Sequence, residues 1–284
     1  MRPILLDLPL AGGLHLRLPA YGTFLVLGML AAVWVSGRHG RHLGLRRADA
    51  FDLGLWLLAG GVLGAHLLHI ALHPGLYFAG GSGTGLKQAA SLWRGGLVYY
   101  GGLAGGGAAL WLWGRRRGLP LIDLFDFVAP LGALGLSVTR VGCFLNGCCY
   151  GIPSRLPWAV SFPPESPAYR RQVELGLIAS GGTALPVHPV QLYEFAAALI
   201  FFLVLWFRFP KRRCAGEVVA AFGILYGSWR LIAEALRADH PGWRPDVFGV
   251  TANQWLSLIL IAVAGTGWWV SRRAARAPIS SQAR

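Results

Sequence analysis

The chain has 284 residues, of which 55% are hydrophobic and only 13% charged, and its mean hydropathy is +0.51. Soluble globular domains carry about 25% charged residues, so this composition excludes soluble, secreted, disordered and collagen-like proteins. It predicts a polytopic membrane protein. The formal net charge of +14 comes from basic residues that lie between apolar runs. We interpret them as topological signals and contacts with anionic lipid, and we expect no binding of nucleic acid.

Seven apolar segments are each long enough to cross the hydrocarbon core as a helix, which takes about 20 residues. They are roughly 18–37, 51–72, 96–114, 121–140, 190–208, 216–236 and 254–271. The first run lacks a small-residue cleavage site after it, so we expect a retained helix rather than a cleaved signal peptide. The sequence therefore predicts an all-α protein with about seven transmembrane helices.

Basic residues cluster on one side of the predicted membrane. The connections after the first, third, fifth and seventh spans carry Arg38, Arg41, Arg46, Arg47, Arg115, Arg116, Arg117, Arg208, Lys211, Arg212, Arg213, Arg272, Arg273 and Arg276. The positive-inside rule places these connections in the cytoplasm. The amino terminus is then outside and the carboxyl terminus cytoplasmic, which agrees with an odd number of spans.

We expect a single membrane domain over residues 1–284. Residues 141–189 form a small head on the outer side between the fourth and fifth spans, because their prolines break any long helix. Residues 272–284 form a basic cytoplasmic tail. Asp123 and Asp126 begin the fourth span, where the dipole of that helix explains them.

One face of the sixth span carries polar side chains, which are costly in lipid and therefore suggest function. Tyr226, Arg230, Glu234 and Arg237 follow a spacing of four, four and three residues, which places them on the same helical face. An ion pair between Arg230 and Glu234 that holds the bundle together is one interpretation. A site for a lipid phosphate is the other, since arginine suits bidentate phosphate contacts.

Two further polar groups are predicted in the outer half of the membrane. Arg140 ends the fourth span, and together with Arg230 it could hold one phosphodiester. The run from His188 through Gln191 to Glu194 begins the fifth span, where it either caps the helix or lines a polar cavity. Tyr21 and Tyr100 lie near the outer ends of the first and third spans, as interface aromatics or as site residues.

Three of the four cysteines are close in sequence. Cys143, Cys148 and Cys149 lack the spacing of a zinc site, and no histidine stands nearby in sequence, so we expect no metal site. On an oxidising outer side, a disulfide from Cys143 to Cys148 or Cys149 is plausible. Cys214 faces the cytoplasm and is expected to be inert.

In this order, these segments resemble the prolipoprotein diacylglyceryl transferases of bacterial inner membranes over nearly the whole chain. The matching motifs are Ala20-Tyr21-Gly22, Gly95-Gly96 with Tyr100-Gly101-Gly102-Leu103, Asp126 with Ala129-Pro130, Arg140-x-Gly142-x-Phe144-x-Asn146-Gly147 with Gly151, His188-Pro189-x-Gln191-Leu192-Tyr193-Glu194, Tyr226-Gly227-x-x-Arg230-x-x-x-Glu234-x-x-Arg237 and Gln254-x-Leu256-Ser257.

The resemblance implies transfer of the diacylglyceryl group of phosphatidylglycerol to the lipobox cysteine thiol of a prolipoprotein. A thioether forms and glycerol phosphate leaves, with no cofactor and no metal. The implied location is the inner membrane, with the site toward the periplasm and nothing requiring more than a monomer. The implied catalytic residues are Arg140, Arg230, Tyr100 and Tyr21. The implied contacts with phosphatidylglycerol come from Arg140, Arg230, Tyr226, Glu234, Arg237, His188, Gln191, Asn146 and Gly151.

Three positions depart from the family pattern. Tyr100 stands where a histidine is common, Cys143 where asparagine is common and Cys148 where glutamate is common. A histidine could accept the thiol proton, whereas tyrosine is a poorer base at neutral pH. A catalytically altered paralogue, or a lipid-binding or transport protein that uses the same arginines, therefore stays as an alternative.

Overall fold

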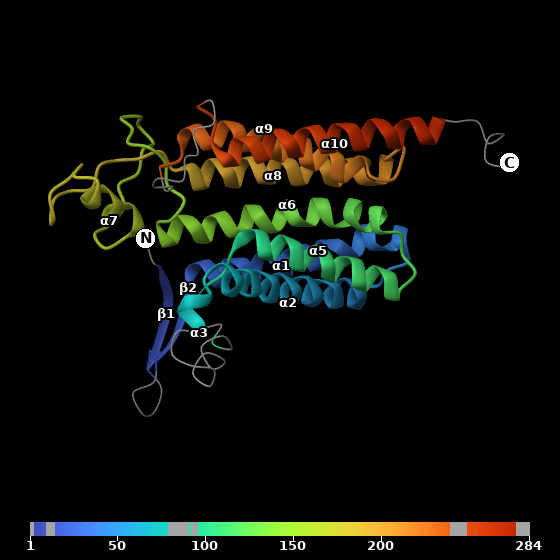
Figure 1. Cartoon of the computed structure of the whole chain (residues 1–284), viewed down its shortest axis with the longest axis horizontal. Coiled ribbons are helices and arrows are strands. Elements are labelled where there is room, and N and C mark those ends of the chain that lie inside the picture. Colours follow the sequence, from blue (N-terminus) through green and yellow to red (C-terminus); the bar gives the residue numbers. More distant parts are fainter. Residues whose placement is uncertain (1–2, 10–14, 79–90, 92–95, 239–248, 277–284) are drawn as a thin grey trace. The chain divides into compact units, whose positions relative to one another are not determined.

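The computed structural model describes residues 3–9, 15–78, 91, 96–238 and 249–276. Within these residues, the helices of 18 residues or more are α1 (Ala20–Gly40), α2 (Arg47–Leu72), α5 (Tyr99–Arg116), α6 (Leu121–Asn146), α8 (Val190–Arg208), α9 (Glu217–Leu236) and α10 (Ala252–Arg276) (Figure 1). Each corresponds to one predicted span. Gly95 of the third-span motif and residues 277–284 of the predicted tail lie outside the described residues.

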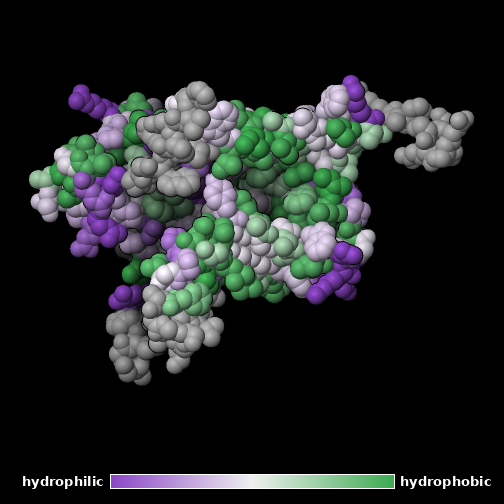
Figure 2. Space-filling view, in the orientation of Figure 1, coloured by the Kyte–Doolittle hydropathy of each residue, from purple (hydrophilic) through white to green (hydrophobic). Residues whose placement is uncertain are grey.

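Of these helices, six are long and apolar enough to cross a membrane, which confirms an all-α polytopic membrane protein. The remaining long helix, α5, is less apolar than these six, because its 18 residues include six glycines. In the most apolar stretch of α2, only 11% of the residues are buried inside the protein, and the same fraction applies to α10. Apolar side chains accordingly cover much of the visible helical surface (Figure 2). Such a surface suits contact with lipid.

The chain divides into two compact units, which we describe separately. The first comprises Met1–Val35 with Phe125–Arg284, and the second comprises Ser36–Leu124. The first contains a hairpin of β1 (Ile4–Pro9) and β2 (His15–Pro19) that the sequence analysis did not anticipate. In the same unit, α9 contacts both α8 and α10. This arrangement places polar residues of α9 between those two helices.

The head follows α6, which continues through Asn146, six residues beyond the predicted end of the fourth span. Arg140 therefore lies within the last two turns of α6 rather than at its end. A short helix α7 (Pro167–Glu174) stands in the head. A small core of Tyr150, Phe162, Ala168 and Val187 holds the head together.

Asp126 has a different role from the expected one. Its buried carboxylate accepts hydrogen bonds from the backbone N–H groups of Gly216, Val218 and Val219, at 2.8, 3.0 and 2.9 Å. Arg212 adds an ion pair at 3.3 Å. The carboxylate thus caps the first turn of α9, whose N–H groups have no partner within the helix. Asp126 fixes α9 against α6, and the dipole of its own helix does not account for this arrangement.

In the second unit, glycines allow α2 and α5 to approach closely. A Cβ atom on Gly105 would lie 2.1 Å from the carbonyl oxygen of Gly60, and one on Gly64 would lie 2.3 Å from that of Gly101. Gly101 and Gly105, four residues apart, thus form a small-residue contact surface of the kind that lets membrane helices pack closely. A Cβ atom on Gly106 would meet nothing within 4 Å.

Gly105 and Gly106 provide a matched pair of substitutions. We expect Gly105→Ala to lower the free energy of unfolding by about 1–3 kcal/mol, because its methyl group overpacks the contact with α2. Gly106→Ala should leave it unchanged or raise it by up to about 1 kcal/mol through helix propensity. Thermal unfolding in detergent measures both, and equal effects of the two substitutions would contradict this helix contact.

Candidate functional site

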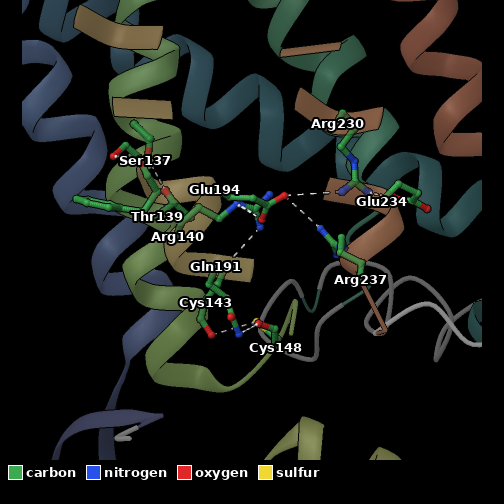
Figure 3. Close-up of polar contacts among 12 residues, drawn as sticks. Ser137, Thr139, Arg140, Cys143, Cys148, Gln191, Glu194, Arg230, Glu234 and Arg237 are labelled. Carbon is green, nitrogen blue, oxygen red and sulfur yellow. Dashed lines mark hydrogen bonds and ion pairs between the residues drawn. The ribbon is translucent and has the colours of Figure 1, made fainter. Parts of the chain in front are cut away.

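A buried carboxylate, Glu194 on α8, lies at the centre of the polar residues in the first unit. Its Oε2 lies 2.9 Å from Nε of Arg140, and its Oε1 lies 3.7 Å from Nη1 of Arg230 and 3.6 Å from Nη1 of Arg237 (Figure 3). The Glu194 side chain is only 5% exposed. Two helices, α6 and α9, and the residue that follows α9 thus bring three guanidinium groups to one carboxylate on α8.

The polar face of α9 extends this network toward α10. Arg230 pairs with Glu234 one turn later, Nη2 to Oε2, at 2.8 Å. Oε1 of Glu234 accepts hydrogen bonds from Asn253 at 3.1 Å and from Thr251 at 3.3 Å. The predicted ion pair between Arg230 and Glu234 is therefore present. It does not exclude a phosphate site, because Arg230 also faces Glu194.

The charges of this network do not cancel. Among the residues that the structure describes, three arginines, Arg140, Arg230 and Arg237, face two glutamates, Glu194 and Glu234, an excess of one positive charge. Their side chains are at most 14% exposed. Buried charge of this kind is costly unless it is paired or binds a ligand. The excess matches the charge of one phosphodiester.

The donors of this network also lack good acceptors. Among the described residues, Nε of Arg140 and Nη1 of Arg230 have ion pairs but no well-directed hydrogen bond, and the buried indole N–H of Trp229 has no hydrogen-bond partner. Trp229, Arg140, Glu194 and Tyr226 line a small cavity of about 10 Å³, which has room for roughly one water molecule. These donors could serve an anionic oxygen.

The end of α6 lies beside the network. The side-chain amide of Gln191, on α8, donates to the carbonyl oxygen of Cys148 at 2.7 Å. Nη1 of Arg140 lies 3.9 Å from the sulfur of Cys143. Hydrogen bonds from the Cys143 and Cys149 thiols and from Asn146 lower the pKa of Cys148, which follows the end of α6. The sequence provides no metal-binding spacing here, yet the structure brings three sulfur atoms together.

The other predicted residues of the first unit surround the network. The Gly151 N–H donates to the carbonyl oxygen of His188 at 3.0 Å, and a Cβ atom on Gly151 would lie 2.7 Å from Cβ of His188. The His188 ring contacts the hydroxyl of Tyr193 at 3.3 Å. A Cβ atom on Gly142 of α6 would lie 3.1 Å from the Cα atom of Tyr21 on α1. Close backbone contacts thus hold Gly151 against His188, and α1 against α6.

Tyr100 lies in the first turn of α5, in the second unit, which is described by itself. Sequence reasoning missed Glu194 as the central carboxylate, and it missed Thr251 and Asn253 entirely. An acidic side chain in the first turns of an apolar span was the available signal for Glu194, because such a residue needs a cationic partner. Thr251 and Asn253 carried no such signal, since uncharged polar residues near a span end are ordinary.

Comparisons with known proteins agree with the sequence motifs. A family model described as prolipoprotein diacylglyceryl transferase matches residues 9–270. A curated phosphatidylglycerol–prolipoprotein diacylglyceryl transferase of Nitratidesulfovibrio vulgaris is 34% identical over 259 residues, covering 89% of this chain and 88% of the relative. A protein of the same name from Bordetella avium is 34% identical over 272 residues, covering 91% and 92%. Another from Methylibium petroleiphilum is 33% identical over 267 residues, covering 90% of each chain.

The central position of Glu194 can be tested by stability. Glu194→Ala removes the carboxylate that three buried guanidinium groups face, and we expect the free energy of unfolding to fall by about 3–5 kcal/mol. The control is Glu174→Ala. It removes a carboxylate that pairs with Arg171 and whose side chain is 61% exposed. That substitution should cost less than about 1 kcal/mol. Similar losses in both variants would contradict a central role of Glu194.

Proposed function

We propose, starting from the fact that this chain belongs to the prolipoprotein diacylglyceryl transferase family, that it transfers a diacylglyceryl group from phosphatidylglycerol to the lipobox cysteine of a prolipoprotein. The cysteine sulfur forms a C–S bond to the glyceryl carbon that carried the phosphate. The C–O bond of that carbon breaks, and glycerol phosphate leaves with the electron pair. The thiol loses its proton.

The observation that carries this proposal is the buried network in which, among the described residues, three arginines face two glutamates. A phosphodiester headgroup carries one negative charge, so its entry offsets this excess of positive charge. Phosphate oxygens replace Glu194 oxygens as acceptors for Arg140 and Arg230, whose planar groups suit bidentate contacts. Glu194 keeps the guanidinium groups in place before the lipid arrives.

The same arginines stabilise the reaction more than they stabilise the bound lipid. As the C–O bond breaks, the phosphate changes from a monoanion toward a dianion. Arg140 and Arg230 therefore interact more strongly with the transition state than with the substrate, which is the condition for catalysis. The low exposure of both side chains, 14% each, strengthens this effect because water screens them little.

The remaining residues position the substrates. Trp229 and Tyr226 line the cavity beside Arg140, where an indole N–H and a phenol can contact a phosphate oxygen. Gly151 and His188 hold the head close to the end of α9, where Gly151 forms a backbone bridge with Arg237. A head in this place admits the signal peptide of the acceptor. Tyr21, whose backbone lies against Gly142 of α6, orients the thiol.

The arrangement in the membrane follows from the arginine distribution. The chain is integral to the membrane and multi-pass. We place its amino terminus in the periplasm, its carboxyl terminus in the cytoplasm and Arg140 in the outer half of a bacterial inner membrane, with a monomer as the working unit. α5 serves as the seventh span. Although its glycines lower its hydropathy, they allow the close contact with α2.

Arginine substitutions test the phosphate contacts. We expect Arg140→Ala and Arg230→Ala each to reduce transfer at least about 100-fold, because a directed charge at the leaving group is lost. Arg140→Lys should also be severely impaired, since lysine cannot replace a bidentate fork. The assay contains purified protein in detergent, phosphatidylglycerol and a lipobox peptide, and it detects glycerol phosphate together with the mass of the thioether.

Arg155→Ala is the control, because Arg155 is exposed in the head, and it should transfer at the unsubstituted rate. Full activity of an Arg140→Ala/Arg230→Ala double variant would refute the phosphate contacts. Well-folded, unsubstituted protein that binds phosphatidylglycerol but releases no glycerol phosphate would instead support the altered paralogue or a lipid-binding protein. Tyr100, Cys143 and Cys148 depart from the family pattern, and these departures are the observation that favours this second candidate.

A further inference from the structure

Three thiols form a cluster at the outer end of α6. The sulfur atoms of Cys143, Cys148 and Cys149 all lie within 4.8 Å of one another. Cys143 is buried and the other two are partly exposed, and all three are free thiols. The disulfide that the sequence made plausible is not formed among these described residues, and the cluster offers three soft ligands on one side of a possible ion.

The helix end explains why the cluster forms from an unusual spacing. The Cys148 N–H donates to the carbonyl oxygen of Cys143 at 3.2 Å, and the Gly147 N–H to that of Phe144 at 3.2 Å. With Gly147 at a φ of 72°, these bonds form a Schellman motif, in which the residues at the Cys143 and Cys148 positions are in contact. Cys149 follows at a φ of 60°, which turns its side chain back to the same place.

The cluster adjoins the phosphate site through Arg140. That guanidinium lies 3.9 Å from the Cys143 sulfur and 2.9 Å from Glu194. Gln191 holds the carbonyl oxygen of Cys148 from α8. A group bound at the three sulfur atoms would therefore lie beside the proposed site of the lipid phosphate. Hydrogen bonds to the backbone fix the positions of its ligands.

We propose that Cys143, Cys148 and Cys149 bind one Zn²⁺ ion, whose fourth coordination position takes the thiol of the acceptor peptide. This inference rests on the proposed transferase function. It gives the reaction a means of activating the thiol, and it assigns a chemical role to three cysteines that the arginine network does not use.

The donor set favours zinc. Thiolates bind Zn²⁺ at about 2.3 Å in a tetrahedron, which places neighbouring sulfur atoms roughly 3.8 Å apart, within reach of the observed cluster. Three thiolates and Zn²⁺ carry a net charge of −1, and the guanidinium of Arg140, 3.9 Å from the Cys143 sulfur, lies close enough to stabilise it. Cu(I) is also thiophilic, but three sulfur atoms satisfy a trigonal Cu(I) ion and leave no position for a substrate. Zinc sites with three protein ligands keep one position open.

The reaction has a need for this ion. The two carboxylates of the network, Glu194 and Glu234, are each paired with arginine, so neither is available as a strong base for the acceptor thiol. A thiol that coordinates zinc is deprotonated outright, and its proton leaves to solvent. The zinc-bound sulfur then attacks the glyceryl carbon while the C–O bond breaks and the phosphate departs toward Arg140 and Arg230. The neutral thioether binds zinc weakly and dissociates, and Zn²⁺ keeps its charge throughout.

Metal content is the first test. Protein purified under reducing conditions and loaded with Zn²⁺ should retain one zinc ion per chain after desalting. X-ray absorption should give three protein sulfur ligands at about 2.3 Å. Cys148→Ser and Cys149→Ser should each lower zinc affinity by 10-fold or more, while Cys214→Ser, outside the cluster, should retain the full zinc content. Thermal unfolding in detergent verifies that each variant is folded.

Coordination of the acceptor thiol is the second test. Co²⁺ in place of Zn²⁺ should give a sulfur-to-metal absorption band that increases when a lipobox peptide with cysteine is added. The same peptide with serine should leave the band unchanged. Removal of zinc by a chelator should lower transfer at least 10-fold, and added Zn²⁺ should restore it in the unsubstituted protein but not in Cys148→Ser.

Failure of this inference differs from failure of the proposed function. Transfer at the full rate by zinc-free protein, or by a folded Cys148→Ser/Cys149→Ser variant, would overturn the zinc site and leave the transferase in place. Zinc retained without any response of the cobalt band to the peptide would overturn the open coordination position. Zinc binding and a peptide response without glycerol phosphate release would instead contradict the transferase.

Discussion

The structure of the first unit depends on how one buried carboxylate, Glu194, is compensated. A lone glutamate in an apolar helix would be far too costly, so its position determines what surrounds it. Arg140 from α6, Arg230 from α9 and Arg237 after α9 all face it. Because the three cations exceed what Glu194 alone can neutralise, Glu234 is required as well. The helices around the site are thus fixed by charge as much as by apolar packing.

Asp126 applies the same principle at the opposite end of α9. It supplies acceptors to three backbone N–H groups that begin that helix, so one carboxylate of α6 determines where α9 starts. Arg230 and Glu234 then follow at the heights set by the helical rise. A polar contact at one end of α9 therefore positions the polar face at the other, and neither end can shift alone without leaving a buried polar group unpaired.

The sequence was sufficient for the parts that depend on periodicity and on the cost of charge in lipid. Arg140, Arg230 and Glu234 were recognisable because arginine and glutamate in an apolar span demand partners. The partner itself, Glu194, depended on which helices are neighbours, and a list of spans does not contain that information. The thiol cluster was missed for another reason. Cys143 and Cys148 are five residues apart, which is the separation of the two residues that meet in a Schellman motif at a helix end. Metal-binding loops have a different spacing, so their patterns do not include it.

In the proposed mechanism, the two glutamates that face the three arginines have a consequence for turnover. The lipid enters as a monoanionic phosphodiester, whereas the glycerol phosphate product leaves as a dianion and would bind more tightly to the same arginines. Three uncompensated arginines would bind that product tightly and slow its release, because tight binding of the ground state gives no advantage in rate. We therefore propose that Glu194 and Glu234 do more than stabilise the fold. In this proposal they reduce the affinity of the site for its product, while Arg140 and Arg230 remain close enough to stabilise the charge that develops as the C–O bond breaks.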